Sequence, residues 1–178
     1  MKSIKFGYSR YVPWLFAILS IFFVSSRSVS QNSSSSNNIF ASSRSIPPPL
    51  KMNEVRTNAA RHFRNHFSAN GNERWYKVDE FYMASFIDGQ VITKAYYSSK
   101  GVFAFSVRYY TQELLSPDTR FLILKKFDGY KIDVITEISN LQEKFYFIKI
   151  KNATNIKTLK VINDNIEVVE DFVNGEGV

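Results

Sequence analysis

Eight short runs rich in aromatic and β-branched residues, with side chains alternating in character, fill most of the chain after residue 73. Such period-2 alternation is typical of strands with one buried face. Turn signals such as Asp88-Gly89 and Ser99-Lys100-Gly101 separate the runs and favour hairpins. The chain is therefore predicted to form antiparallel strands at 74–78, 82–87, 91–97, 102–109, 131–138, 144–151, 156–162 and 166–172.

A helix is predicted before each set of four strands. The second begins with Ser116 as its N-cap and Pro117 as its first residue, and Asp128-Gly129 ends it. The first is predicted from an apolar stripe that ends before Asn70-Gly71 and consists of Met52, Val55, Ala59, Phe63 and Phe67. This order predicts an α+β fold, in which two tandem helix-plus-four-strand repeats form one antiparallel sheet of about eight strands with both helices on one face.

A gapless comparison of the two halves supports the repeat. Residues 81–107 lie over residues 145–171 at a constant offset of 64 (81 to 145), with identities at Phe81/Phe145, Tyr82/Tyr146 and Ile92/Ile156. The turn at Ser99-Lys100 falls on Asn163-Asp164. Because the identities are few, chance similarity stays open as an alternative, and the shared order of elements is the stronger part of the comparison.

The first 30 residues are typical of a secretory signal peptide. Lys2, Lys5 and Arg10 precede an apolar run at 14–24, and these 11 residues are fewer than the roughly 20 that span a bilayer. Cleavage is predicted after Ser30, with Ser26 as an alternative, and an uncleaved anchor or a buried helix stays open. Residues 31–50 are predicted to be a Ser/Asn/Pro-rich linker and residues 51–178 the folded domain, in the periplasm or secreted, without a membrane span after cleavage.

Charge and cysteine content exclude several classes of function. The chain has 23 basic and 16 acidic residues, and the first 30 residues hold 4 of the basic ones and no acidic one, so the rest carries 19 − 16 = +3. A balance this small, without clustering, argues against nucleic-acid binding. Because there is no cysteine, disulfides, thiolate zinc sites and cysteine nucleophiles are excluded. The fold must then be held by its core alone, to which the 16% of aromatic residues contribute.

Catalytic and metal-binding patterns are weak. His62 and His66 lie four residues apart on the first predicted helix, but Phe63 stands where a zinc protease needs glutamate, so packing on the helix face is favoured over metal binding. No nucleophile elbow or glycine-rich phosphate loop occurs. The glycosylation sequon Asn152-Ala153-Thr154 matters only in a eukaryotic secretory route. We therefore predict no catalytic residue, no metal, no cofactor and no enzymatic activity.

Several segments resemble the PepSY-like family of exported proteins, which is common in Bacteroidota and similar in fold to the β-lactamase inhibitory protein. The resemblance covers roughly residues 51–176 and lies in core and turn patterns: residues 59–63, 74–76, 81–86, 95–101, 115–118, 127–132 and 136–138. It implies a periplasmic or secreted module that binds proteins or peptides, without catalytic residues to carry over. The chain lacks the cysteines of the inhibitor itself, so inhibition of that enzyme is not implied.

The sheet face away from the helices is the predicted binding surface. Alternation assigns Tyr82, Ala84, Phe86, Ala95, Tyr97, Phe103 and Phe105 to the helix side. It places aromatic and basic side chains on the other side, a composition found at protein–protein hot spots. The predicted partner-binding residues are Met83, Lys94, Tyr96, Arg108, Tyr110, Phe147 and Lys149.

Three questions stay open at this point. An ordinary half-exposed sheet face explains the same pattern of side chains. The facing of the last strand is unresolved, because the repeat sets Glu167 over Phe103. The leading function is protein or peptide binding, with inhibition of the bound protein as one form of it, and the alternative is a small-molecule carrier with a pocket between sheet and helices.

Overall fold

A computed structural model describes residues 47–173 of the chain. The predicted signal peptide and most of the predicted linker lie outside the described residues. The helices are α2 (Thr57–His66) and α3 (Pro117–Lys126), preceded by the short 3₁₀ helices η1 (Met52–Glu54) and η2 (Gln112–Leu114). The strands are β1 (Arg74–Val78), β2 (Phe81–Asp88), β3 (Val91–Tyr97), β4 (Phe103–Tyr110), β5 (Lys131–Ser139), β6 (Lys144–Lys151), β7 (Asn155–Ile162) and β8 (Asn165–Val173).

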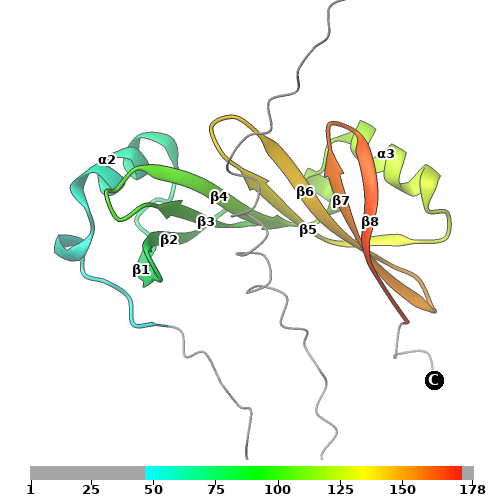
Figure 1. Cartoon of the computed structure of the whole chain (residues 1–178), viewed down its shortest axis with the longest axis horizontal. Helices are drawn as coiled ribbons and strands as arrows, with labels where there is room; N and C mark the ends of the chain where they lie inside the picture. Colours follow the sequence, from blue (N-terminus) through cyan, green and yellow to red (C-terminus); the bar gives the residue numbers. More distant parts are fainter. Residues whose placement is uncertain (1–46, 174–178) are drawn as a thin grey trace, which may run out of the picture. The chain divides into compact units, whose positions relative to one another are not determined.

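All eight strands form one antiparallel sheet in chain order, from β1 at one edge to β8 at the other (Figure 1). The predicted α+β fold is confirmed, and so is the repeated order, because each set of four strands follows a 3₁₀ turn and a helix. The turn between β7 and β8 falls at Asn163 and Asp164, as predicted, and both residues have a positive φ. Each hairpin needs only a short connection, which the antiparallel arrangement allows.

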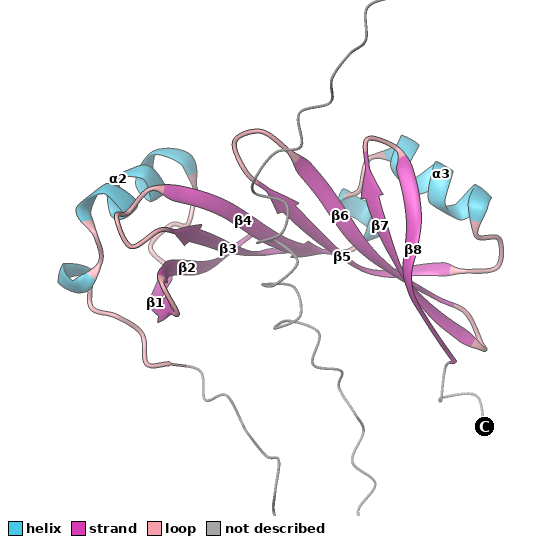
Figure 2. Cartoon of the chain, viewed as in Figure 1, coloured by secondary structure: helices cyan, strands magenta, loops and turns pink. Residues whose placement is uncertain are grey.

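Both helices pack on the same face of the sheet, which we call the helix face. The pairing register shows this, because a row of directly opposed residues crosses the sheet from β2 to β7 and directly opposed residues share a face. The row runs from Phe86 to Val161. Phe86 belongs to the apolar cluster beneath α2, and Val161 to the cluster beneath α3. Figure 2 shows α2 beside the first strands and α3 beside the last ones.

Small side chains let α2 approach the sheet closely. Ala59 and Ala60 on the helix and Ala84 and Ala95 on the sheet are buried in one cluster with several aromatic rings. The predicted stripe is right at Val55, Ala59 and Phe63, which are buried. It is wrong at Met52, which lies in η1 and is 51% exposed. The helix also ends earlier than predicted, because Phe67 has extended backbone angles (φ −128°, ψ 136°).

The second helix begins as predicted. The Ser116 side chain accepts a hydrogen bond from the Thr119 backbone N–H (3.2 Å), and Pro117 is the first helical residue. Ile123 is fully buried against the sheet. Phe121, in contrast, is 64% exposed, so the helix is real but its apolar residues do not all face the core.

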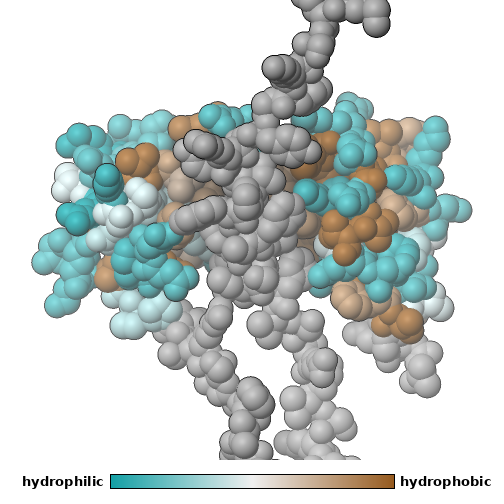
Figure 3. Space-filling model, in the orientation of Figure 1, coloured by the Kyte–Doolittle hydropathy of each residue, from teal (hydrophilic) through white to brown (hydrophobic). Residues whose placement is uncertain are grey.

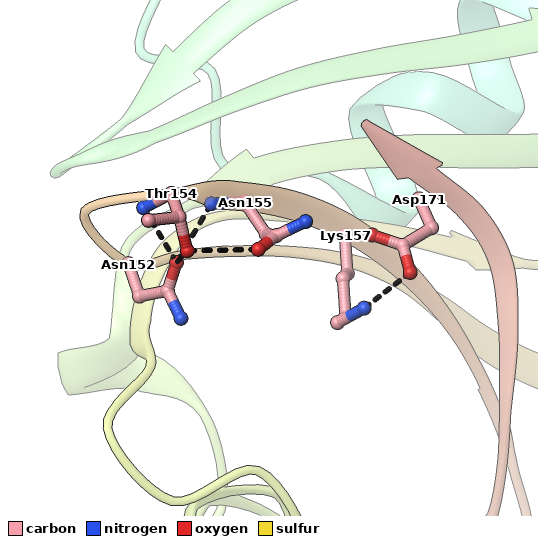
Figure 4. A network of polar contacts seen from close by, with 5 residues as sticks. All are labelled: Asn152, Thr154, Asn155, Lys157 and Asp171. Atoms are coloured by element: carbon pink, nitrogen blue, oxygen red, sulfur yellow. Dashed lines mark hydrogen bonds and ion pairs between the residues drawn. The ribbon is translucent and has the colours of Figure 1, made fainter. Parts of the chain in front are cut away.

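Polar contacts hold the last two hairpins, in the turn between β6 and β7 and between the strands β7 and β8 (Figure 4). The Asn152 Oδ1 atom accepts hydrogen bonds from the backbone N–H groups of Thr154 (3.0 Å) and Asn155 (2.7 Å), which closes the turn between β6 and β7. Lys157 on β7 pairs with Asp171 on β8. The sequon therefore lies in a tight turn.

Strand β8 is an edge strand with apolar side chains in water. In the space-filling view, apolar residues appear among hydrophilic ones over the last strands (Figure 3). The exposed apolar residues of this strand are Val168, Val169, Phe172 and Val173. One backbone group of this edge is satisfied by α3, because the Lys126 ammonium donates to the Ile166 carbonyl (2.9 Å).

Candidate functional site

The sheet face opposite the helix face is the candidate site, and we call it the open face. Within residues 47–173, the elements that cover the sheet are α2 and α3, and both lie on the helix face. The register gives the members of the open face as rows of opposed residues. Its central rows hold Tyr76, Met83, Tyr96 and Phe105; Arg74, Ser85, Lys94, Val107, Ile138 and Phe145; and Ile92, Tyr109, Thr136, Phe147, Lys160 and Glu167.

Five of the seven predicted partner-binding residues lie on the open face. These are Met83, Lys94, Tyr96, Phe147 and Lys149. Tyr96 and Phe147 are buried, whereas Met83, Lys94 and Lys149 are half-buried. The aromatic members therefore form the floor of the face, and the longer flexible side chains lie above and around them.

The prediction is wrong for Arg108 and Tyr110, which lie on the helix face. A β-bulge causes the error: Tyr96 pairs with Phe105 while Tyr97 pairs with Phe103, so β4 has one extra residue, Ala104. Because side chains alternate with a period of two, one extra residue reverses every later side chain. The bulge also moves Phe105, which was predicted to face the helices, to the open face.

Arg108 and Tyr110 instead hold a carboxylate at the junction of the two halves. Glu137 on β5 is 5% exposed, and it accepts hydrogen bonds from the Tyr110 hydroxyl (2.7 Å) and the Arg108 guanidinium (3.1 Å). Burial, followed by the hydrogen bond to Glu137, raises the pKa of Tyr110. A buried carboxylate needs such partners, so this group has a structural explanation.

The first half of the open face carries an aromatic cluster. Tyr96 stacks on Phe105, with ring centroids 4.6 Å apart, and Phe81 meets both rings edge-on. Phe81, Phe105 and Tyr109 were missed as site residues. Phe81 lies two residues before Met83 and fits the plain alternation, whereas Phe105 and Tyr109 fit it only once the bulge at Ala104 is known.

A lysine and a second tyrosine lie beside this cluster. The Lys94 ammonium is 5.4 Å from the centroid of the Tyr109 ring. Burial lowers the pKa of Lys94 and raises the pKa of Tyr109. Burial, with a smaller electrostatic effect of Tyr109, also raises the pKa of Tyr96. Both phenols therefore stay protonated at neutral pH and present hydroxyl donors.

The second half of the open face is aromatic on β6 and charged towards the edge. The rings of Phe145 and Phe147 are 5.8 Å apart. The Thr158 hydroxyl donates to Glu170 on β8 (2.6 Å), and Lys160 lies opposite Glu167. This also resolves the facing of the last strand: Glu167 lies on the open face, since its partner Lys160 is opposed to Phe147.

The two histidines pack on the helix side of the sheet. The ring of His62 stacks on those of His66 (4.0 Å) and Phe103 (4.9 Å), and its Nδ1 atom is 3.2 Å from the Tyr97 hydroxyl. Burial and the neighbouring His66 lower the pKa of His62. In the part of the chain that the structure describes, no three His, Asp or Glu side chains are grouped so as to hold a metal ion.

A pocket of about 430 Å³ lies at the N-terminal end of α2. It is lined by the polar residues Arg56, Thr57, Asn58, Ser99 and Lys100. It does not lie between the sheet and a helix, so it lends no support to a carrier of apolar molecules there. That alternative stays a prediction.

No protein-family model matches the chain. No curated protein matches it either. Solved structures do. A DUF2874 family protein from Bacteroides ovatus is 14% identical with a TM-score of 0.54, over 67% of this chain and 87% of that one. A BLIP-like protein from Bacteroides fragilis is 8% identical with a TM-score of 0.53, over 68% of this chain and 89% of that one. The chain has the BLIP-like fold.

A third similar structure concerns location. A protein from Bacteroides eggerthii, described as a candidate periplasmic protein, is 10% identical with a TM-score of 0.52, over 67% of this chain and 88% of that one. None of these three descriptions names an enzymatic activity. Within residues 47–173, no helix has the length and apolar character needed to cross a membrane.

Proposed function

We propose that the chain is an exported, non-enzymatic module that binds a protein or a peptide through its open face. The observation that carries the proposal is the separation of the two faces. Both helices cover the helix face, and the open face carries an aromatic floor with lysines around it. Aromatic residues are enriched at the centres of protein interfaces, where they bury a large area at a low cost in conformational entropy.

Export is part of the proposal and rests on the first 30 residues. Their basic start and apolar run fit a signal peptide. The similar structure from Bacteroides eggerthii, described as a candidate periplasmic protein, agrees with export. The PepSY-like resemblance belongs here too. It is supported by the BLIP-like fold, whereas the family name rests on the sequence patterns alone.

The proposed contact residues are Met83, Lys94, Tyr96, Phe147 and Lys149. Met83 is unbranched and adapts to different shapes, as residues at binding surfaces often do. Arg108 and Tyr110 are no longer proposed, because they face the other side and hold Glu137.

The first test is capture of partners from the native exported fraction with the mature chain as bait. Phe147→Ala and Lys149→Glu alter the open face, and Phe121→Ala is the matched control, because Phe121 is an exposed aromatic residue on α3 with Lys125 5.8 Å from its ring centroid. We expect one or more proteins to be retained by the wild type and by Phe121→Ala and lost by both open-face variants. Circular dichroism spectra must show that each variant is folded. Equal retention by all four baits contradicts the proposal.

A further inference from the structure

The hydroxyl of Tyr96 is the one unexplained polar group on the described open face. The side chain is 2% exposed, and its Oη atom has no hydrogen-bond partner. A buried hydroxyl without a partner is unusual in native proteins and calls for an explanation, because it loses its bond to water on burial and gains nothing in return. The helix-face neighbour Tyr97 shows the contrast, since its hydroxyl lies 3.2 Å from His62 Nδ1.

Two more donors lie on the same face as this hydroxyl, at neighbouring positions of the sheet. Lys94 is two residues away on the same strand and face, and its ammonium lies 5.4 Å from the ring centroid of Tyr109. Tyr109 is on the neighbouring strand β4 and on the same face, and its electrostatic effect raises the pKa of Tyr96, in addition to the larger effect of burial. A lysine provides donors only, and a protonated phenol provides one donor, so the three groups together suit an acceptor.

The charge around the three donors indicates which acceptor fits. The open-face positions of β1–β4 include Arg74 and Lys94 and no carboxylate, whereas Glu167 and Glu170 lie on β8 at the far edge and Asp133 on β5 pairs with Lys151. Among protein groups, the carboxylate of an acidic side chain is both charged and a multiple acceptor.

We propose that Lys94, Tyr96 and Tyr109 form a recognition site for an acidic side chain that the partner presents from within an apolar segment. The inference rests on the proposed function and names the chemistry of its partner. The aromatic cluster of Phe81, Tyr96 and Phe105 receives the apolar flanks, and the donors receive the carboxylate. Met83 on β2 lies directly opposite Tyr96 on β3, and its flexible side chain can move aside to admit the carboxylate.

The test uses two pools of short peptides that are identical except for glutamate or glutamine at one central position. The exported chain is attached to a surface and exposed to each pool. The amounts of peptide that it retains are compared for the wild type, Tyr96→Phe and Tyr97→Phe. Both substitutions remove one hydroxyl from adjacent residues on opposite faces. We expect the wild type and Tyr97→Phe to prefer the glutamate pool roughly tenfold, as hydrogen bonds to a charged group allow, and Tyr96→Phe to lose most of that preference.

A thermal unfolding curve distinguishes recognition from a structural role. Tyr96→Phe removes a buried hydroxyl without a partner, so its unfolding midpoint is expected to equal or exceed that of the wild type, whereas Tyr97→Phe loses the contact with His62 and unfolds earlier. Equal retention of both pools by the wild type overturns the inference. So does an undiminished glutamate preference in Tyr96→Phe, or retention of neither pool. If the wild type retains both pools equally and Phe147→Ala lowers the retention of both, the open face binds peptides but does not recognise a carboxylate.

Discussion

Among the glycines that the structure describes, Gly101 is the one at which an added methyl group should destabilise the fold most. It lies in the hairpin turn between β3 and β4 with φ +78°, a backbone conformation that L-residues with a Cβ atom rarely adopt. A Cβ atom added there would lie 3.0 Å from the Arg56 Cβ atom and 3.1 Å from the Ala59 backbone nitrogen, at the start of α2. Gly101→Ala should therefore push α2 away from the hairpin on which it packs.

The size of the effect follows from two separate costs. The left-handed conformation costs an alanine about 1–2 kcal/mol, and overpacking against a backbone that cannot easily move adds roughly 1–3 kcal/mol. The less flexible unfolded chain gives back about 0.4–1 kcal/mol. The free energy of unfolding should fall by roughly 1–5 kcal/mol in total, with about 3 kcal/mol as the central value.

Gly129 provides a control with the same strain and no contact. Its φ is +77°, and nothing lies within 4 Å of an added Cβ atom. Gly129→Ala should therefore cost only about 0.5–1 kcal/mol. At about 4 °C per kcal/mol for a domain of this size, Gly101→Ala should unfold roughly 8 °C below Gly129→Ala in a thermal scan followed by circular dichroism. Equal midpoints for the two variants would refute the packing of α2 against this turn.

Three further predictions concern stability. Burial and the nearby His66 lower the pKa of His62, so the unfolded chain binds more protons than the folded one. The stability that neutral His62 contributes is full above about pH 6.5 and falls as the pH drops below that value. His62→Gln should therefore flatten the dependence of the urea midpoint on pH between about pH 7.5 and about pH 5. Arg108→Met should cost about 1–2 kcal/mol in urea unfolding, less than a fully buried pair because the guanidinium side chain is 41% exposed, and adding Glu137→Met should recover part of the loss. Ser116→Ala should cost about 1 kcal/mol by loss of the N-cap of α3, and an unchanged midpoint would contradict that role.

The fold could be predicted from the sequence because its signals are local and repeated. Period-2 alternation, turn residues with positive φ such as Gly89 and Gly101, and the Ser116-Pro117 start of a helix each act over a few residues. The shared order of elements in the two halves then fixed a single sheet with both helices on one face.

The candidate site could be predicted only in part. The face on which a side chain lies is inferred by alternation along the strand, and one bulge reverses that assignment for every residue after it. The facing is right for Met83 on β2 and for Lys94 and Tyr96 on β3, because the extra residue of the bulge is on β4. Arg108 and Tyr110 follow it, and their facing is wrong. Tyr97 and Phe103, which pair with each other beside the extra residue Ala104, both have their rings against His62 of α2, a contact between residues far apart in the sequence.

The same limit applies to buried polar groups. Glu137 reads as an ordinary polar-face residue of a strand, and only the pairing of β4 with β5 brings it to Arg108 and Tyr110. The unpartnered hydroxyl of Tyr96 is likewise a property of its surroundings rather than of its residue type.

Side-chain NMR of a complex with a captured partner tests the central claim most directly. Ile135 and Ile138 lie on the same strand, β5, with Ile135 on the helix face opposite Tyr110 and Ile138 on the open face opposite Val107. With methyl-labelled isoleucine and methionine, adding the partner should shift the signals of Ile138 and Met83 and leave that of Ile135 in place. Shifts confined to Ile135, or no shift at either isoleucine, would contradict binding through the open face.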